Sequence, residues 1–169
     1  MLKLSPKFKE FILTETKRDF LEGTTAAGKT TVGIFKFMLM VAKSDIKYHV
    51  IAGADLGTVE KNVINNERGL LDQFNGLAEY YPKGQGRIGL SHIKYQTLNG
   101  EKIIYVCGYD NKARWKKVLG SQQGCVYIDE VNTADMEFLR EISHRCKYMM
   151  TTSNPDSPDL LVYKEFINH

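Results

Sequence analysis

The sequence is poor in the features that mark secreted, zinc-binding or disulfide-stapled proteins. Only three of its 169 residues are cysteines, and Cys107, Cys125 and Cys146 are never spaced as C-x-x-C. An odd number without that spacing argues against a disulfide framework or a metal site and predicts buried, reduced thiols. The four histidines form neither H-x-x-x-H nor H-E-x-x-H, so the common helical zinc patterns are absent.

Long apolar runs are absent as well. No run approaches the ~20 residues that a membrane-spanning helix needs, and the first ten residues carry no apolar segment typical of a signal peptide. Hydrophobic residues make up 43% and charged residues 25% of the chain, and the net charge of +3 is too small to identify a partner. We therefore expect one globular, cytoplasmic domain over residues 1–169.

One segment indicates a specific chemistry. Residues 23–30 read GTTAAGKT, the phosphate-binding pattern G-x-x-x-x-G-K-[ST]. Its glycines allow backbone angles that let successive N–H groups surround an anion. Lys29 supplies a charge for the β- and γ-phosphates, and the Thr30 hydroxyl is placed to ligate Mg²⁺. The predicted nucleotide contacts are Gly23, Thr24, Thr25, Ala26, Ala27, Gly28, Lys29, Thr30 and Thr31.

Strand-like and helix-like segments alternate around this loop. A short strand enters it and a helix that is apolar nearly all round leaves it, which is the context that the motif requires. Asn99-Gly100 predicts a tight β-hairpin. The pattern favours an α/β fold with a mostly parallel sheet covered by helices on both faces and an antiparallel hairpin at one edge. The expected strands are 18–22, 48–53, 93–98, 102–107, 125–128 and 148–152. One helix is expected directly after the loop, and others at 59–74, 134–144 and 160–167.

A second motif follows an apolar strand. Cys125-Val126-Tyr127-Ile128 ends in Asp129-Glu130, the form of a Walker B motif. Neighbouring residues on a strand point to opposite sides, so we expect the two carboxylates to differ in role. Asp129 would join Thr30 at Mg²⁺, and Glu130 would take a proton from the attacking water. Without the upstream loop, an acidic turn that merely ends a strand would explain this segment better.

A third segment, Met149 to Pro155, reads MMTTSNP. Ligands of open α/β sheets lie beyond the carboxyl ends of the strands. Thr151, Thr152, Ser153 and Asn154 would then face the γ-phosphate and report its loss to the rest of the molecule. The alternative is a polar turn that simply terminates the strand.

With these three motifs in order, residues 12–168 resemble the ATPase domain of tailed-phage large terminase subunits. The resemblance rests on GTTAAGKT at 23–30, CVYIDE at 125–130 and TTSNPDSP at 151–158. It implies a RecA-like P-loop fold of the class with an added catalytic glutamate. It also implies Mg²⁺-dependent ATP hydrolysis that moves double-stranded DNA into a procapsid. The implied partners are DNA, a portal protein, a small terminase subunit and further copies of the chain in a ring, and the implied location is the host cytoplasm.

The sequence departs from the family in two respects. Large terminases carry a C-terminal nuclease domain, whereas this chain ends at His169 without a second acidic cluster, so we expect no nuclease activity. Several members also place an arginine inside the phosphate loop, where this chain has Thr24 to Ala27. A charge for the transition state must therefore come from elsewhere, and a neighbouring subunit could supply it.

Six arginines could provide that charge, and we favour Arg114, followed by Arg87. Arg114 lies in the basic segment KARWKK at 112–117, which contains the single tryptophan and could equally contact DNA through non-specific charge. Lys17 and Arg18 are candidate adenine contacts. Two other functions stay open: a helicase-like or other RecA-like nucleic-acid ATPase, and a nucleotide-binding module that is inactive without a partner subunit.

Overall fold

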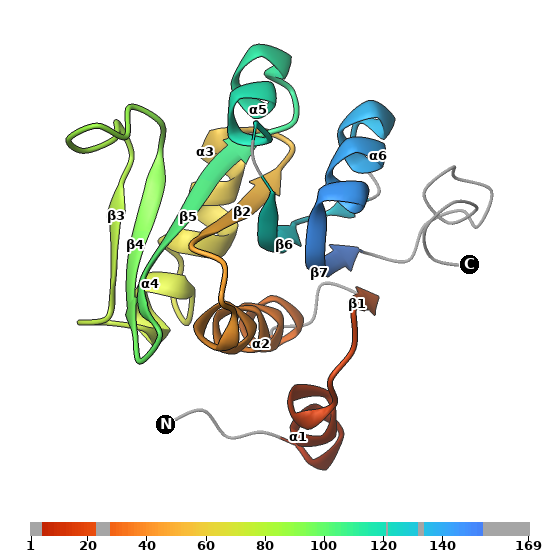
Figure 1. Cartoon of the computed structure of the whole chain (residues 1–169). Coiled ribbons are helices and arrows are strands. Elements are labelled where there is room, and N and C mark those ends of the chain that lie inside the picture. The colour runs from red at the N-terminus through yellow and green to blue at the C-terminus, as the bar shows by residue number, and fades with distance from the viewer. Residues whose placement is uncertain (1–4, 23–27, 121, 132–133, 154–169) are drawn as a thin grey trace.

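The computed structural model describes residues 5–22, 28–120, 122–131 and 134–153. They form a seven-stranded mixed sheet in the order β1-β7-β6-β2-β5-β4-β3 (Figure 1). The strands β1 (Arg18–Glu22), β7 (Cys146–Ser153), β6 (Gln123–Ile128), β2 (Tyr48–Gly53) and β5 (Gly100–Gly108) are parallel. β4 (His92–Thr97) pairs antiparallel with β5 and with β3 (Ala78–Tyr81). The predicted mostly parallel sheet with antiparallel pairing at one edge is confirmed.

Helices cover both faces of the sheet, as predicted. One apolar core lies under α2 (Lys29–Lys43), the short helices α3 (Leu56–Val59) and α4 (Leu70–Gln73), and the π-helical turn η1 (Glu60–Ile64). The other core lies under α5 (Lys112–Val118) and α6 (Met136–Arg145). Because parallel strands are buried on both sides, their sequences read as continuous apolar runs, and every residue of β6 is buried.

The strand order brings the three sequence motifs together. β1 leads into the phosphate loop, β6 into Asp129 and Glu130, and β7 carries the third motif. β7 lies between the other two, with Phe20 opposite Thr151 and Ile128 opposite the same residue from the other side. Since all three strands are parallel, their carboxyl ends meet at one edge of the sheet, where a ligand site is expected.

The predicted single helix over residues 59–74 is wrong. The structure divides this region into α3, η1 and α4, with a turn between η1 and α4. Arg68 adopts a left-handed backbone with φ of 60°, which no helix accommodates. A side chain at Gly69 would overlap Asn66, since the Cβ would lie 2.0 Å from its Oδ1. The sequence interpretation also missed β3, α5 and α1 (Pro6–Leu13), while the helix expected from residue 160 lies outside the described residues.

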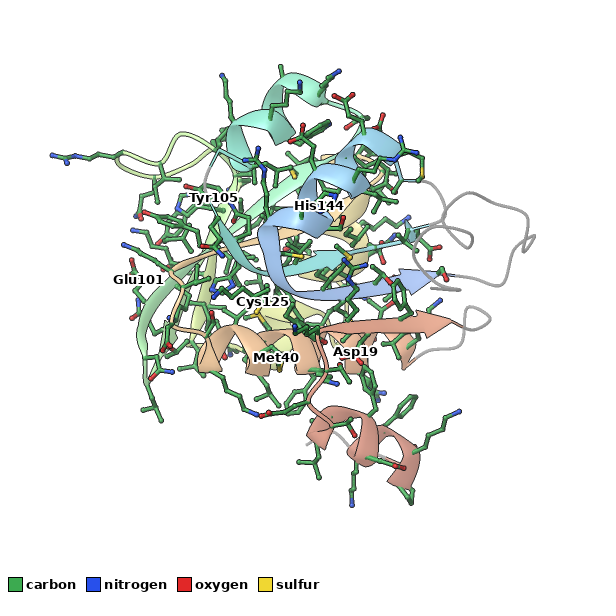
Figure 2. All side chains as sticks on the ribbon, turned by 45° about the vertical axis from the view of Figure 1, so that its right-hand side comes forward. Asp19, Met40, Glu101, Tyr105, Cys125 and His144 are labelled. Atoms are coloured by element: carbon green, nitrogen blue, oxygen red, sulfur yellow. The ribbon has the colours of Figure 1, made fainter. Side chains whose placement is uncertain are left out.

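The amino end of β1 is held by a buried ion pair. Lys36 of α2, whose side chain is 1% exposed, lies 2.7 Å from the Asp19 carboxylate and donates to the carbonyl of Thr14 at 2.8 Å. The Tyr148 hydroxyl of β7 donates to the same carboxylate at 2.7 Å. Figure 2 shows Asp19 at the start of β1, close to α2. This network fixes the segment before β1, the helix α2 and the strand β7 relative to one another.

The predicted free thiols are confirmed. Cys107 and Cys125 are buried and Cys146 is partly exposed, and all three are unpaired. Burial raises the pKa of Cys107 and Cys125 to about 12, so these thiols behave as small apolar groups. Among the described helices, none combines the length and apolar character that crossing a bilayer would require.

Candidate nucleotide-binding and catalytic site

The described end of the phosphate loop has the conformation that its glycine permits. Gly28 has φ of 127°, a region that L-residues avoid, and α2 begins at the next residue. The first N–H groups of a helix have no partner within the helix, and the helix dipole adds partial positive charge there. The amino end of α2 therefore suits an anion. The predicted contacts Gly23, Thr24, Thr25, Ala26 and Ala27 lie outside the described residues.

Lys29 joins the first motif to the third. Its ammonium group donates to the carbonyl oxygen of Ser153 at 2.8 Å, across 124 residues of sequence. Ser153 is the last residue of β7, and its side chain is buried. The lysine assigned to phosphate thus already touches the end of the strand assigned to coupling.

Asp129 lies in the same group of side chains. The residue is 3% exposed, its Oδ1 accepts a hydrogen bond from the Thr152 hydroxyl at 3.1 Å, and its Oδ2 lies 3.5 Å from the Asn62 amide nitrogen. Burial raises the pKa of Asp129, while the bonds from Thr152 and Asn62 and the positive charge of Lys29 oppose that rise. The charges of the first and second motifs therefore act on each other directly.

Glu130 differs from the sequence expectation in its backbone. β6 ends at Ile128, so alternation along a strand does not separate Asp129 from Glu130. Instead Glu130 has φ of 51°, a left-handed conformation that is rare for a residue with a side chain. Its N–H donates to the Thr152 hydroxyl at 3.2 Å, and its carbonyl accepts from the Tyr109 hydroxyl at 3.2 Å. Two bonds hold this strained residue in place, and such strain is frequent at functional sites.

The predicted coupling residues make different contacts. Thr152 contacts both Asp129 and Glu130, and Ser153 contacts Lys29. The buried Thr151 hydroxyl has no hydrogen-bond partner among the described residues, and strand alternation turns Thr151 toward the opposite face of the sheet from Thr152. Asn154 lies outside the described residues.

Thr30 and Thr31 occupy the first turn of α2. Burial raises the pKa of Tyr127, the strand residue two positions before Asp129, and the Thr30 side chain opposes that rise. Thr31 offers its carbonyl to the Gln73 amide at 3.1 Å, and the same amide donates to the carbonyl of Arg68 at 2.7 Å. The start of α2 is thus tied to β6 below it and to α4 beside it.

Arg114 lies apart from these groups. It follows β5, which is four strand positions and about 19 Å from β1 at the usual strand spacing. Burial raises the pKa of Cys107 and of Tyr80, and the Arg114 charge opposes both shifts; at Asp129 the corresponding charge is that of Lys29. Within its own chain Arg114 therefore belongs to the β5–β3 side of the sheet.

Trp115, the single tryptophan of the basic segment, is buried and does not belong to an exposed surface. The indole is 1% exposed and packs edge-to-face against Phe138, with the ring centroids 5.4 Å apart. Helical periodicity explains this, because α5 must bury one side against the sheet while its lysines face outward. Lys112 and Lys116 both lie near Glu137 of α6, at 2.8 and 3.7 Å. A DNA contact by this segment would have to use its exposed charges.

Lys17 and Arg18, the predicted adenine contacts, do not lie at the same end of β1 as Lys29. Both lie at the amino end of β1, whereas Lys29 follows its carboxyl end. The aromatic ring of Phe8, on α1, instead lies 3.9 Å from the point where a Cβ on Gly28 would sit. Asn62, Gln73 and Phe8 are the contacts that sequence reasoning missed, and no motif marks them, because each depends on how a distant segment packs.

A cavity of about 440 Å³ lies at the amino ends of the parallel strands, opposite the ends that carry the three motifs. Its lining includes Lys17, Met40 and Lys147, which lie at the amino ends of β1 and β7 and near the carboxyl end of α2. The cavity is therefore separate from the site around Lys29.

Comparison with known proteins gives a fold and little sequence similarity. No protein-family model matches the chain, and no curated protein matches it. A large terminase from a thermophilic bacteriophage matches 99% of this chain with a TM-score of 0.83 at 17% identity. The large terminase ATPase domain of Thermus phage P74-26 matches 93% of this chain and 72% of its own length, with a TM-score of 0.52 at 14% identity. The fold is that of a large terminase ATPase domain.

The first of these terminases has also been solved with ATP-γ-S, and that structure matches 98% of this chain with a TM-score of 0.72 at 18% identity. Our chain spans 43% of the terminase chain in the first structure and 38% in the ATP-γ-S complex. The shared terminase fold therefore covers nearly all of this chain and less than half of the thermophilic phage protein.

Proposed function

We propose that this chain is the ATPase part of a large terminase subunit, which hydrolyses ATP with Mg²⁺ to move double-stranded DNA into a procapsid. The observation that carries the proposal is the convergence of Lys29, Asp129 and Thr152 from three parallel strands or their following segments. The terminase fold supports it, and the thermophilic phage terminase has been solved in complex with ATP-γ-S and with ADP.

The chemistry assigned to each group follows from its charge and position. Lys29 and the amino end of α2 bind the phosphates and neutralise them. The donor set of Thr30 and Asp129, a hydroxyl and a carboxylate, suits Mg²⁺. The buried Asp129 carboxylate is oriented by the Thr152 hydroxyl and the Asn62 amide, which are both uncharged. When bound, Mg²⁺ would supply positive charge to the β- and γ-phosphates. Glu130 accepts the proton of the attacking water.

Coupling runs through the end of β7. Lys29 holds the Ser153 carbonyl, and a phosphate that draws the ammonium group toward itself would lengthen this bond, because the charge-assisted bond to phosphate is the stronger of the two. Binding of ATP would thus change the contacts of β7, and the release of phosphate would restore them. By its resemblance the motor would act with a portal protein, a small terminase subunit and further copies of this chain, in the host cytoplasm.

Two substitutions test the assignment. Lys29→Ala should abolish ATP binding, because the phosphates lose their charged partner. Glu130→Gln should bind ATP normally and lower turnover at least ~100-fold, because an amide cannot accept the proton. Binding is measured by calorimetry and turnover by phosphate release. Lys43→Ala, which changes an exposed lysine at the far end of α2, is the matched control.

The same assay separates the alternatives if it is run with and without DNA over a range of protein concentrations. Stimulation by double-stranded DNA supports the packaging motor, whereas stimulation by single strands alone would support a helicase-like ATPase. Binding without turnover at any concentration would indicate a module that needs a partner subunit. Equal turnover by the wild type and Glu130→Gln would contradict the proposed chemistry.

A further inference from the structure

Tyr127 is a buried polar residue that the assigned chemistry does not use. It is 0% exposed and lies on β6 opposite Met150 of β7. Thr152 lies two residues beyond Met150, and residues two apart on a strand share a face of the sheet. Asp129 follows the end of β6, and its carboxylate contacts Thr152 and lies near Asn62 of η1. Tyr127, Asp129 and Thr152 therefore all face α2, whose residues belong to the same core.

The first turns of α2 pack directly on this tyrosine. Gly33 lies one turn after Thr30, and a Cβ there would be 3.5 Å from Cε2 and 3.6 Å from the hydroxyl of Tyr127. The same Cβ would lie 3.1 Å from Leu21 of β1. Glycine is unfavourable inside a helix, so its presence here matches the close approach of helix and strand. The Tyr127 hydroxyl therefore reaches beneath the first turn of α2, which carries Thr30.

The hydroxyl is enclosed but makes no hydrogen bond of ordinary geometry within the described part of the chain. Burial and the negative charge of Asp129 raise the pKa of Tyr127, and the nearby hydroxyls of Thr152 and Thr30 oppose that rise. The polar atoms around it thus belong to all three motifs. A buried hydroxyl without a partner is costly, so small shifts that let it bond should be favourable.

The donors and acceptors of these side chains allow one continuous series of hydrogen bonds. Thr152 donates its only hydroxyl hydrogen to Asp129 and accepts from the N–H of Glu130, and its second lone pair can accept from another donor. Tyr127 can donate to that lone pair and accept from Thr30. This series of hydrogen bonds runs from Thr30 through Tyr127 and Thr152 to Asp129, and its two ends are the two groups assigned to Mg²⁺.

We propose that Tyr127 is a positioning residue, whose hydroxyl links the threonine of the phosphate loop to the coupling strand and so orients the Mg²⁺ ligands Thr30 and Asp129. The inference rests on the proposed function, because it concerns the same site. It adds a direct path from the metal ligands to Thr152. Thr30 and Asp129 would hold the cation, and the contacts through Tyr127 and Thr152 would connect these two residues by way of β7.

The test compares Tyr127→Phe with Tyr148→Phe, two tyrosines on the same face of the sheet. The Tyr148 hydroxyl bonds to Asp19, away from Lys29. ADP affinity is measured by calorimetry in Mg²⁺ and in EDTA, and thermal stability is measured without nucleotide. Tyr127→Phe should reduce the Mg²⁺-dependent gain in ADP affinity about tenfold, the effect of one hydrogen bond, with little change in thermal stability. Tyr148→Phe should do the reverse.

The possible results separate cleanly. A wild-type protein that binds ADP no better in Mg²⁺ than in EDTA would overturn the proposed function, and the role of Tyr127 with it. A normal wild type with an unchanged gain in Tyr127→Phe would overturn only the role of Tyr127. So would a fall in thermal stability as large as that of Tyr148→Phe, which would indicate a structural role. If Tyr127 acts through Thr152, adding Tyr127→Phe to Thr152→Val should cause no further loss of the Mg²⁺-dependent gain.

Discussion

Asp129 and Glu130 are neighbours in sequence but are held by different means. The Asp129 side chain is fixed by Thr152 and lies near Asn62. Glu130 is fixed through its backbone, by Thr152 and Tyr109, in a conformation that residues with a side chain rarely adopt. A single hydroxyl, that of Thr152, serves both residues. A change at Thr152 should therefore disturb the proposed metal ligand and the proposed catalytic base together.

His49 gives a residue-scale prediction for stability. The ring is fully buried, with Nε2 donating to the Ile46 carbonyl at 2.8 Å and Nδ1 accepting from the Cys125 N–H at 2.8 Å. Burial lowers the pKa of His49 from 6.5 to about 4. Below pH 6.5 the unfolded chain therefore binds a proton that the folded protein refuses, and stability falls until the pH reaches about 4.

Between about pH 7.5 and 4.5 this one group should remove about 2 to 3 kcal/mol of the free energy of unfolding. His49→Gln should be less stable at the higher pH, and its deficit should shrink by that amount at the lower pH. Urea denaturation at both pH values measures the difference. His144→Gln, at an exposed position on α6, is the control, and parallel curves for the wild type and His49→Gln would contradict the prediction.

At the scale of elements, α2 connects the candidate phosphate site with the sheet and with α1. Its first turn carries Lys29 and Thr30, Gly33 allows close packing on β1 and β6, and Lys36 forms the buried pair with Asp19. The Lys36 ammonium nitrogen also lies 4.3 Å from the centroid of the Phe11 ring, and this contact connects α1 to α2. One face of α2 thus fixes both the phosphate site and the segment that precedes β1.

Lys36→Met tests this arrangement. It leaves the Asp19 carboxylate buried without its positive partner, which typically costs about 3–5 kcal/mol. Lys43→Met removes an exposed lysine 3.8 Å from Glu15 and should change stability by less than about 1 kcal/mol. Chemical denaturation measures both variants. Adding Asp19→Asn to Lys36→Met should recover part of the loss, and equal effects of the two single substitutions would refute the role of the pair.

At the scale of the whole molecule, the sheet separates the phosphate site from Arg114. The strand order β1-β7-β6-β2-β5 places the three motifs at one end and the segment with Arg114 further along (Figure 1). An arginine that stabilises the transition state can come from another subunit. If Arg114 has this role, the active site is completed between two copies of the chain.

We predict that Arg114→Ala lowers ATP turnover about 10³-fold or more while nucleotide affinity stays nearly unchanged. Turnover by the wild type should rise more than linearly with protein concentration. Mixing Arg114→Ala with Glu130→Gln should restore part of the activity, because one protein supplies the arginine and the other the intact catalytic site. Phosphate release measures each case.

Arg87→Ala is the comparison for this experiment, since Arg87 is exposed in the loop between β3 and β4. If mixing with Glu130→Gln restores the activity of Arg87→Ala and not that of Arg114→Ala, Arg87 is the arginine that acts between subunits. Loss of DNA affinity in Arg114→Ala with normal ATP turnover would assign Arg114 to the nucleic acid instead.

Local sequence determined the elements whose signals are local. The apolar strand before Asp129 follows from burial on both faces, and the hairpin predicted at Asn99-Gly100 follows from turn geometry, with its turn at residues 98–99. The structure has β1, β2, β6 and the hairpin strands within about two residues of the predicted positions. Where local and tertiary preferences conflict, as between residues 59 and 74, the apolar periodicity gave the wrong helix.

The sequence by itself thus determined which chemical groups are present and in what order the strands that carry them follow one another along the chain. Only the tertiary structure decided which groups meet: Ser153 at Lys29, Asn62 near Asp129, Tyr127 against Gly33, and Trp115 inside the core. The physical reason is that a strand or loop signal depends on neighbours in sequence. A contact across the sheet depends on strand order and on how closely a helix can approach, and neither can be obtained from any one segment.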